Sequence, residues 1–110
     1  MGLNYDINEE KDLIKISLDG DLDAYSSDEF KDAVLKQLPG SKDILINAKK
    51  LNFIDSTGLG SLISIYNTIK EQEKTISIEE IKPNVKQIFE ITELDKLFNI
   101  KTNYMKSSRK

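Results

Sequence analysis

Hydrophobic and polar residues alternate near the start of the chain, as they do in a strand with one buried face. Ile14, Ile16 and Leu18 are separated by single polar residues, which predicts such a strand. Residues 3–7 show the same pattern more weakly. A polar turn at 9–12 lies between the two segments, so we expect them to pair as a hairpin.

Short apolar segments predict further elements in the middle and at the end of the chain. The continuous run 44–46 is typical of a strand covered on both faces or nearly so, and residues 75–78 alternate like a half-buried strand. Leu97, Phe98 and Ile100 predict a short turn or an edge strand.

Three segments show the spacing of an amphipathic helix. Ser26 and Glu29 form a capping box that opens the first helix, and Pro39-Gly40 ends it. Asp55 precedes the second helix, and Pro83 suits the first turn of the third. The expected buried positions are Phe30, Ala33, Val34 and Leu38 in the first helix, Leu59, Leu62, Ile63, Tyr66 and Ile69 in the second, and Val85, Ile88 and Phe89 in the third.

Strands separated by helices of this length require crossover connections, which produce a largely parallel sheet. The sequence therefore predicts a small α/β domain with a mixed, mostly parallel β-sheet of four to five strands and three to four α-helices. The 110 residues leave room for one domain. We expect that domain at 1–100 and a flexible basic tail at 101–110.

Composition excludes several classes of function. The chain has no cysteine and no histidine, so it cannot form disulfides or thiolate zinc sites and lacks the commonest general base. The net charge of −3 argues against direct binding of nucleic acid. No apolar run approaches the roughly 18 residues of a membrane span, and the start is not a signal peptide. We therefore expect a soluble, cytoplasmic protein without membrane contact.

The segment Asp55-Ser56-Thr57-Gly58-Leu59-Gly60 is the main candidate for chemistry, because it follows a predicted strand and opens the most regular helix. The N–H groups and dipole of a helix start would tolerate an anion on Ser56. A capped helix start with glycines that allow tight packing explains the same residues without a function. Catalytic patterns do not fit: Ile54 replaces the first glycine of a nucleophile elbow, and no lysine follows the glycines before Lys70.

A second acidic segment comprises Asp19, Asp21 and Asp23. An EF-hand loop starting at Asp19 would need glycine and glutamate where Ala24 and Phe30 stand, and a start at Asp21 fits no better. The segment is interpreted as a solvated loop between a strand and a helix. A role in facing a partner or supporting a switch is the alternative.

Two motifs together resemble the bacterial anti-sigma-factor antagonists, the single-domain STAS proteins. They are Gly20-Asp21-Leu22-Asp23-Ala24-Tyr25-Ser26 and, about thirty residues later, Phe53-Ile54-Asp55-Ser56-Thr57-Gly58-Leu59-Gly60. Residues 81–94 are similar to the third helix of the family, and the resemblance covers residues 3 to about 100. It is greatest to the branch that controls general stress-response sigma factors.

This resemblance implies a phosphorylation-controlled binding module with no catalysis, cofactor or metal of its own. Ser56 would be the phosphoacceptor. The unphosphorylated protein would bind an anti-sigma factor that is also a serine kinase, thereby freeing a sigma factor, and a PP2C-type phosphatase would reset it. Apart from the resemblance, we expect the protein to be a monomer. The implied partner-binding residues are Asp21, Asp23, Asp55, Ser56, Thr57, Gly58, Leu59 and Gly60. We also expect Asp23 to orient the Ser56 loop.

The chain departs from the family after the second helix, where relatives often carry a glycine pair and this chain has Glu71-Gln72-Glu73-Lys74. Two other functions remain open at this point. One is a constitutive scaffold domain of the same fold, in which Ser56 is never modified. The other is a regulatory domain that binds a small anion or a nucleotide at the helix start.

Overall fold

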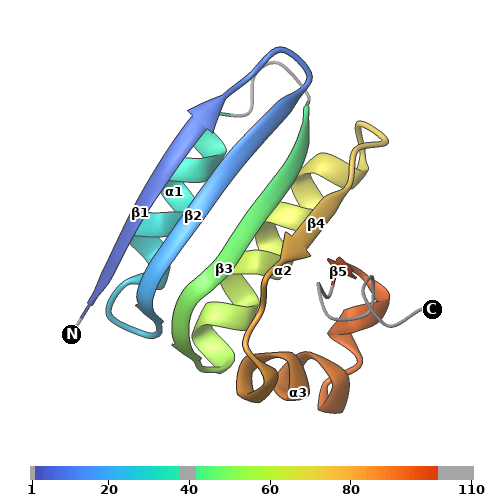
Figure 1. The fold of residues 1–110 in the computed structure, drawn as a ribbon. Coiled ribbons are helices and arrows are strands. Elements are labelled where there is room, and N and C mark those ends of the chain that lie inside the picture. The colour runs from blue at the N-terminus through green and yellow to red at the C-terminus, as the bar shows by residue number, and fades with distance from the viewer. Residues whose placement is uncertain (1, 38–41, 102–110) are drawn as a thin grey trace.

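The computed structural model describes residues 2–37 and 42–101, and these residues form one five-stranded sheet and three α-helices (Figure 1). The elements are β1 (Leu3–Glu9), β2 (Leu13–Leu22), α1 (Ser27–Lys36), β3 (Asp43–Ile54), α2 (Ser56–Lys70), β4 (Ile76–Glu79), α3 (Pro83–Ile91), a 3-10 turn (Leu94–Lys96) and β5 (Asn99–Lys101). The predicted α/β class is confirmed.

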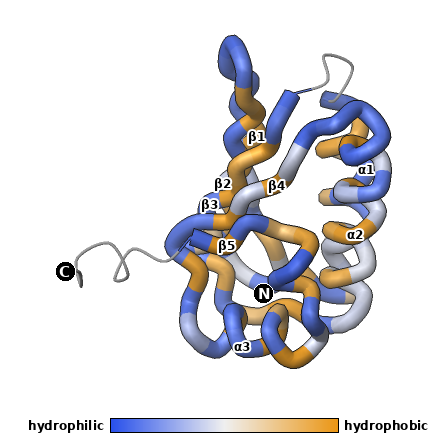
Figure 2. Tube along the Cα trace, turned by 90° about the vertical axis from the view of Figure 1, so that its right-hand side faces the viewer, coloured by the Kyte–Doolittle hydropathy of each residue, from blue (hydrophilic) through white to orange (hydrophobic). Residues whose placement is uncertain are grey.

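The five strands lie in the sheet in their order along the chain. The hairpin predicted from the first two segments is confirmed, because β1 pairs with β2 in antiparallel register. The pairs β2–β3, β3–β4 and β4–β5 are parallel. Right-handed crossovers between strands that advance in one direction carry their helices to one face of the sheet. Figure 2 shows this arrangement, with α1 and α2 on the same side of the strands.

Within residues 2–37 and 42–101, no helix lies over the opposite face of the sheet, and this bears on one prediction. Ile44 and Ile46 are buried beneath the helices, whereas Leu45 between them is only half-buried. Leu45 pairs with Lys15 and Ser77, so it stands on the uncovered face. The run 44–46 was predicted to be covered on both faces or nearly so; it is fully covered on the helix side only, and Leu45 on the other side is half-buried.

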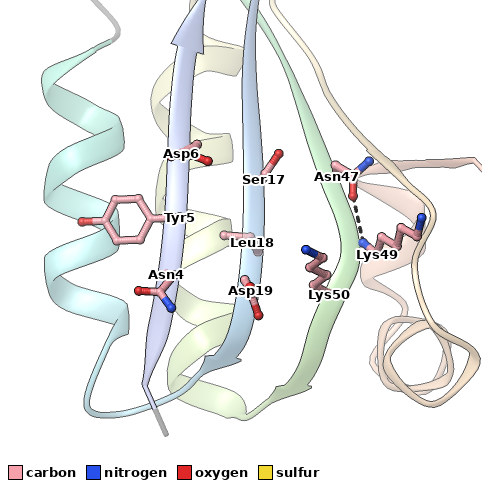
Figure 3. Close-up of a pocket in the computed structure, with 9 residues that line it drawn as sticks. All are labelled: Asn4, Tyr5, Asp6, Ser17, Leu18, Asp19, Asn47, Lys49 and Lys50. Carbon is pink, nitrogen blue, oxygen red and sulfur yellow. Dashed lines mark hydrogen bonds between the residues drawn. The ribbon is translucent and has the colours of Figure 1, made fainter.

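Polar side chains cover that open face. A shallow depression of about 500 Å³ lies there, away from the ends of the strands. Figure 3 shows Tyr5 pointing from the same strands in the other direction, toward α1. The side chains that line the depression from the open face are Asn4, Asp6, Ser17, Asp19, Asn47, Lys49 and Lys50.

The capping box predicted at the start of α1 is absent. Ser26 stands at the N-cap position, but its side chain caps no helix N–H. Its hydroxyl instead donates to the carbonyl oxygen of Asp21 at 2.9 Å. Phe30 and Val34 face the core as predicted, and Ala33 is half-buried. The predicted burial of Leu38 and the stop at Pro39-Gly40 lie outside the described residues.

The second and third helices begin where the sequence predicted. In α2, Leu59, Leu62 and Ile69 are buried as expected, while Ile63 and Tyr66 are half-buried. Ile65, which the predicted stripe omitted, is fully buried. Pro83 is the first residue of α3, whose Val85 and Phe89 are buried.

The C-terminal residues complete the core. Phe98 is buried, and its ring meets the rings of Tyr66 and Phe89 edge-on at centroid distances of 5.7 Å. Strand β5 then ends at Lys101, one residue past the predicted end of the domain. The tail was predicted at 101–110; Lys101 belongs to β5, and the remaining residues, 102–110, lie outside the described residues.

Candidate functional site

The two motifs found in the sequence meet at the carboxyl ends of β2 and β3. The last residues of these parallel strands, Leu22 and Ile54, are paired in register. The backbone N–H of Asp55 donates to the carbonyl oxygen of Leu22 at 3.3 Å. Two segments thirty residues apart in sequence therefore form one site, as expected at the carboxyl edge of a parallel sheet.

The carboxylate of Asp55 joins these segments. Its Oδ1 accepts a hydrogen bond of 2.9 Å from the N–H of Gly58, which makes Asp55 the N-cap of α2. Its Oδ2 accepts from the N–H of Ala24 at 3.2 Å. One side chain thus fixes both the start of α2 and the loop that leads into α1.

The loop after β2 is held by its own side chains. Asp23 Oδ1 accepts a hydrogen bond of 3.0 Å from the N–H of Tyr25, which is an Asx turn. The hydroxyl of Ser26 accepts from the N–H of Asp23 at 3.1 Å while donating to the carbonyl of Asp21. Ser26 therefore closes the loop instead of capping the helix.

These contacts give Asp23 a different position from the one expected. The hydrogen bonds of its side chain stay within the loop 23–26, and in the described part of the chain none reaches Ser56. Asp55 makes the direct link between this loop and α2. Asp23 is linked to α2 through the loop whose Ala24 N–H is bound by Asp55, and its role in orienting the Ser56 loop stays a prediction.

Ser56 and Thr57 are exposed at the first two positions of α2. The first N–H groups of a helix have no intrahelical acceptor. The side chain of Asp55 accepts a hydrogen bond from only one of them, the N–H of Gly58. The Ser56 hydroxyl therefore stands in solvent beside free N–H groups and the positive end of the helix dipole. This environment accommodates an anion.

The two glycines of the segment have different roles. A Cβ on Gly58 would lie 2.2 Å from the carbonyl oxygen of Leu22 and 2.9 Å from Cγ1 of Ile54, so the fold itself requires glycine there. A Cβ on Gly60 would have no atom within 4 Å. Gly58 and Leu59 are buried and shape the site from beneath, while Gly60 lies on the surface.

Sequence reasoning missed two contributors to the site, the N–H of Ala24 and the hydroxyl of Ser26. Both lay within the quoted motif at 20–26. Every residue except proline has a backbone N–H, so the residue type of Ala24 does not indicate that its N–H is used in the site. Ser26 carried a signal, but that signal equally fits a helix cap.

The charged side chains of the two motifs are all acidic and are not arranged as metal ligands. Asp21, Asp23 and Asp55 are each half-buried. Within 2–37 and 42–101, no group of three acidic side chains is placed to hold a metal ion. Over the same ranges, no helix has both the length and the apolarity needed to span a membrane.

The sequence profile of the STAS domain family matches residues 4–106. Because this match spans most of the 110 residues, the chain belongs to the STAS domain family, as the two motifs predicted.

Two anti-sigma-B factor antagonists are similar to the chain along most of their length. The protein from Bacillus subtilis (strain 168) is 25% identical over 100 residues, which are 91% of this chain and 92% of the relative. The protein from Staphylococcus aureus (strain NCTC 8325) is 26% identical over 101 residues, which are 91% of this chain and 94% of the relative.

Solved structures share the fold. An anti-sigma-factor antagonist (STAS) domain protein from Planctomyces limnophilus has a TM-score of 0.80 at 16% identity, over 97% of this chain and 95% of that one. The Bacillus cell fate determinant SpoIIAA in its phosphorylated form has a TM-score of 0.71 at 16% identity, over 96% and 98%. At such identities the likeness shows the fold alone.

Proposed function

We propose that the protein is an anti-sigma factor antagonist whose partner binding is controlled by phosphorylation of Ser56. Unphosphorylated, it binds an anti-sigma factor that is also a serine kinase, and a sigma factor is thereby released for transcription. A PP2C-type phosphatase removes the phosphate. The names of the relatives from Bacillus subtilis and Staphylococcus aureus support the antagonist role. A structural neighbour solved in a phosphorylated form supports the modification.

The position of Ser56 is the observation that carries this proposal. Its side chain is exposed, and Ser56 is the first residue of α2, the helix that Asp55 caps. A kinase and a phosphatase both need such access. The helix dipole stabilises a negative charge at this position by roughly 0.3–1 kcal/mol, so a phosphate does not disrupt the helix.

In the transfer step, Ser56 Oγ forms a bond to the γ-phosphorus of ATP while the bond from that phosphorus to the bridging oxygen of ADP breaks. ADP leaves, and the hydroxyl proton passes to a base of the kinase. The chain is thus a substrate and a binding module rather than an enzyme. It acts in the cytoplasm, where sigma factors meet RNA polymerase.

Phosphorylation switches partners through charge at the interface. It adds about −1.5 to −2 charges next to Asp55, at an edge that also carries Asp21 and Asp23. The proposed docking surface consists of these three side chains with Ser56, Thr57 and Gly60, while Gly58 and Leu59 set its shape. An interface penalty of about 2–3 kcal/mol would weaken binding roughly 30- to 150-fold.

The test uses the purified protein, ATP and each purified serine kinase of the histidine-kinase-like ATPase fold from the same genome. Intact mass and peptide mapping should show one phosphate on Ser56 in the wild type and in Ser64→Ala, and none in Ser56→Ala. Ser64→Ala is the matched control because Ser64 is an exposed serine on the same helix, outside the proposed docking surface.

The other outcomes discriminate between functions. Stable kinase binding without phosphate on Ser56 would favour a constitutive scaffold domain. Neither binding nor phosphate would overturn the proposal. Calorimetric titration with nucleotides or with simple anions other than chloride is the test of the small-ligand function. Binding heat in these titrations, with none in a chloride control, would favour a small-ligand domain instead.

A further inference from the structure

Tyr25 is the most exposed large hydrophobic side chain in the described part of the chain, with 96% of its surface open to solvent. It lies in the loop between β2 and α1. A side chain so exposed contributes almost nothing to the core. The fold therefore does not account for an aromatic residue at this position.

The backbone that carries Tyr25 is fixed. The N–H of Tyr25 itself is bound by Asp23 Oδ1 at 3.0 Å, and the N–H of Ala24 is bound by Asp55 Oδ2 at 3.2 Å. The next two N–H groups, those of Ser26 and Ser27, both donate to the carbonyl oxygen of Asp23. A surface residue held in this way loses less conformational freedom on binding, which favours affinity.

Tyr25 is also tied to the phosphoacceptor. Asp55 binds the residue directly before Tyr25 and directly precedes Ser56. The aromatic side chain and the Ser56 hydroxyl are thus attached to the two ends of one hydrogen-bonded unit. We therefore expect a partner that covers Ser56 to reach the loop of Tyr25 as well.

The charge around Tyr25 defines the partner that fits. Residues 21–30 contain four acidic side chains and no lysine or arginine. Asp55 adds another carboxylate to the same surface. A complementary partner has a basic rim around an apolar pocket, because charge complementarity guides association while buried aromatic residues supply most of the affinity.

We propose that Tyr25 is a preformed aromatic anchor, which inserts into an apolar, basic-rimmed pocket of the kinase that recognises Ser56. This inference rests on the proposed function and names the residue outside the phosphoacceptor segment that fixes the partner. Tyrosine is among the residue types that most often dominate binding energy at protein interfaces.

The experiment compares Tyr25→Ala and Tyr25→Phe with Ile91→Ala. Ile91 is a matched control because it is also a large, exposed hydrophobic residue, with 73% of its surface open to solvent. It is the last residue of α3, whereas the hydrogen bond from Asn84 to the Asn52 carbonyl of β3 is made by the first turn of that helix. Binding of the purified kinase is measured by calorimetry. Tyr25→Ala should weaken binding at least about tenfold, Tyr25→Phe by less than about threefold and Ile91→Ala hardly at all.

A kinetic readout separates docking from chemistry. Phosphorylation of Tyr25→Ala should show a raised KM for the protein substrate with an unchanged kcat, as expected when binding common to the ground state and transition state is lost. Unfolding in urea should match the wild type, because Tyr25 is outside the core.

Three results would overturn the inference. If Tyr25→Ala binds and reacts like the wild type, Tyr25 is not an anchor, although the proposed function stands. If Tyr25→Phe is as weak as Tyr25→Ala, the hydroxyl rather than the apolar ring makes the contact. If no kinase binds the wild type, the proposed function fails and the inference fails with it.

Discussion

Oδ2 of Asp55 lies 3.2 Å from the backbone nitrogen of Ala24, a residue 31 positions earlier in the chain. The other oxygen of the same carboxylate caps α2 through Gly58. A single side chain therefore couples the helix that presents Ser56 to the loop that presents Tyr25.

Asp55→Ala is expected to lower the free energy of unfolding by about 1–2 kcal/mol, because it removes the helix cap and leaves the N–H of Ala24 without its acceptor. Asp55→Asn should lose less, since one oxygen remains to cap the helix. Urea unfolding measures both. The amide of Ala24 should also exchange faster in Asp55→Ala, and unchanged exchange would show that the link is not stabilising.

The glycines at 58 and 60 provide a matched pair. Gly58→Ala should destabilise the protein by roughly 1–3 kcal/mol, because the new Cβ would collide with the carbonyl of Leu22. Gly60→Ala should stabilise it by up to about 1 kcal/mol, because the Cβ meets open space and alanine favours a helix. Equal effects of the two changes on urea unfolding would contradict this assignment.

Gly60→Ala also tests the docking surface without weakening the fold. Because the site is exposed, an added methyl group would occupy space that the partner needs. We expect Gly60→Ala to raise the free energy of unfolding and, in calorimetry, to weaken binding of the kinase. Unchanged binding would remove Gly60 from the docking surface.

Alternation predicted the sheet only where the strands are regular. Between Asn47 and Lys50 the register of β3 slips by one residue against β2, so Lys49 and Lys50 both face solvent. A second slip before Phe53 has the same effect. These bulges break the period of two, and this is why the sequence indicated only the first few residues of a strand that runs from Asp43 to Ile54.

The site was predictable in its residues but not in its contacts. Asp55 and Ser56 could be identified because a helix start after a strand has local signals. The neighbour of Gly58 could not, because the approach of the Leu22 carbonyl depends on how two strands far apart in sequence pair. Tyr25 reads in sequence like any apolar residue, and only the three-dimensional arrangement shows it to be exposed.

The turn after α2 contains a left-handed backbone conformation, which glycine usually adopts, but this chain has no glycine there. Glu73 adopts a left-handed conformation with φ of 63°. The N–H groups of Glu73 and Lys74 donate to the carbonyls of Lys70 and Ile69, which is a Schellman motif. The departure from the glycine pair of the family therefore leaves the turn in place at the cost of one strained residue.

Glu73→Gly should raise the free energy of unfolding by about 0.5–1 kcal/mol, because glycine adopts this conformation without the steric penalty of a Cβ. Glu71→Gly is the control, since Glu71 has a right-handed φ of −65° and glycine there gains nothing. Urea unfolding should rank Glu73→Gly above the wild type and Glu71→Gly at or below it. The reverse order would mean that Glu73 is not strained.

Tyr5 makes the stability of the folded protein depend on pH in the alkaline range. Burial raises the pKa of its hydroxyl above the usual value of 10.0, and the carboxylate of Glu29, 3.4 Å away, raises it further. Because the neutral form is favoured in the folded protein, its contribution is fully present below the unfolded pKa and is lost as pH rises through the higher folded pKa.

Stability should therefore fall above about pH 10 more steeply in the wild type than in Tyr5→Phe, which keeps the edge-on contact with Phe30 but has no ionisable group. Urea unfolding at several alkaline pH values measures the two slopes, and the comparison cancels the titration of the lysines. Tyrosinate absorbance provides a second readout, since the titration of the Tyr5 hydroxyl should be missing in Tyr5→Phe. Parallel slopes for the two proteins would show that Tyr5 ionises as freely in the folded chain as in the unfolded one.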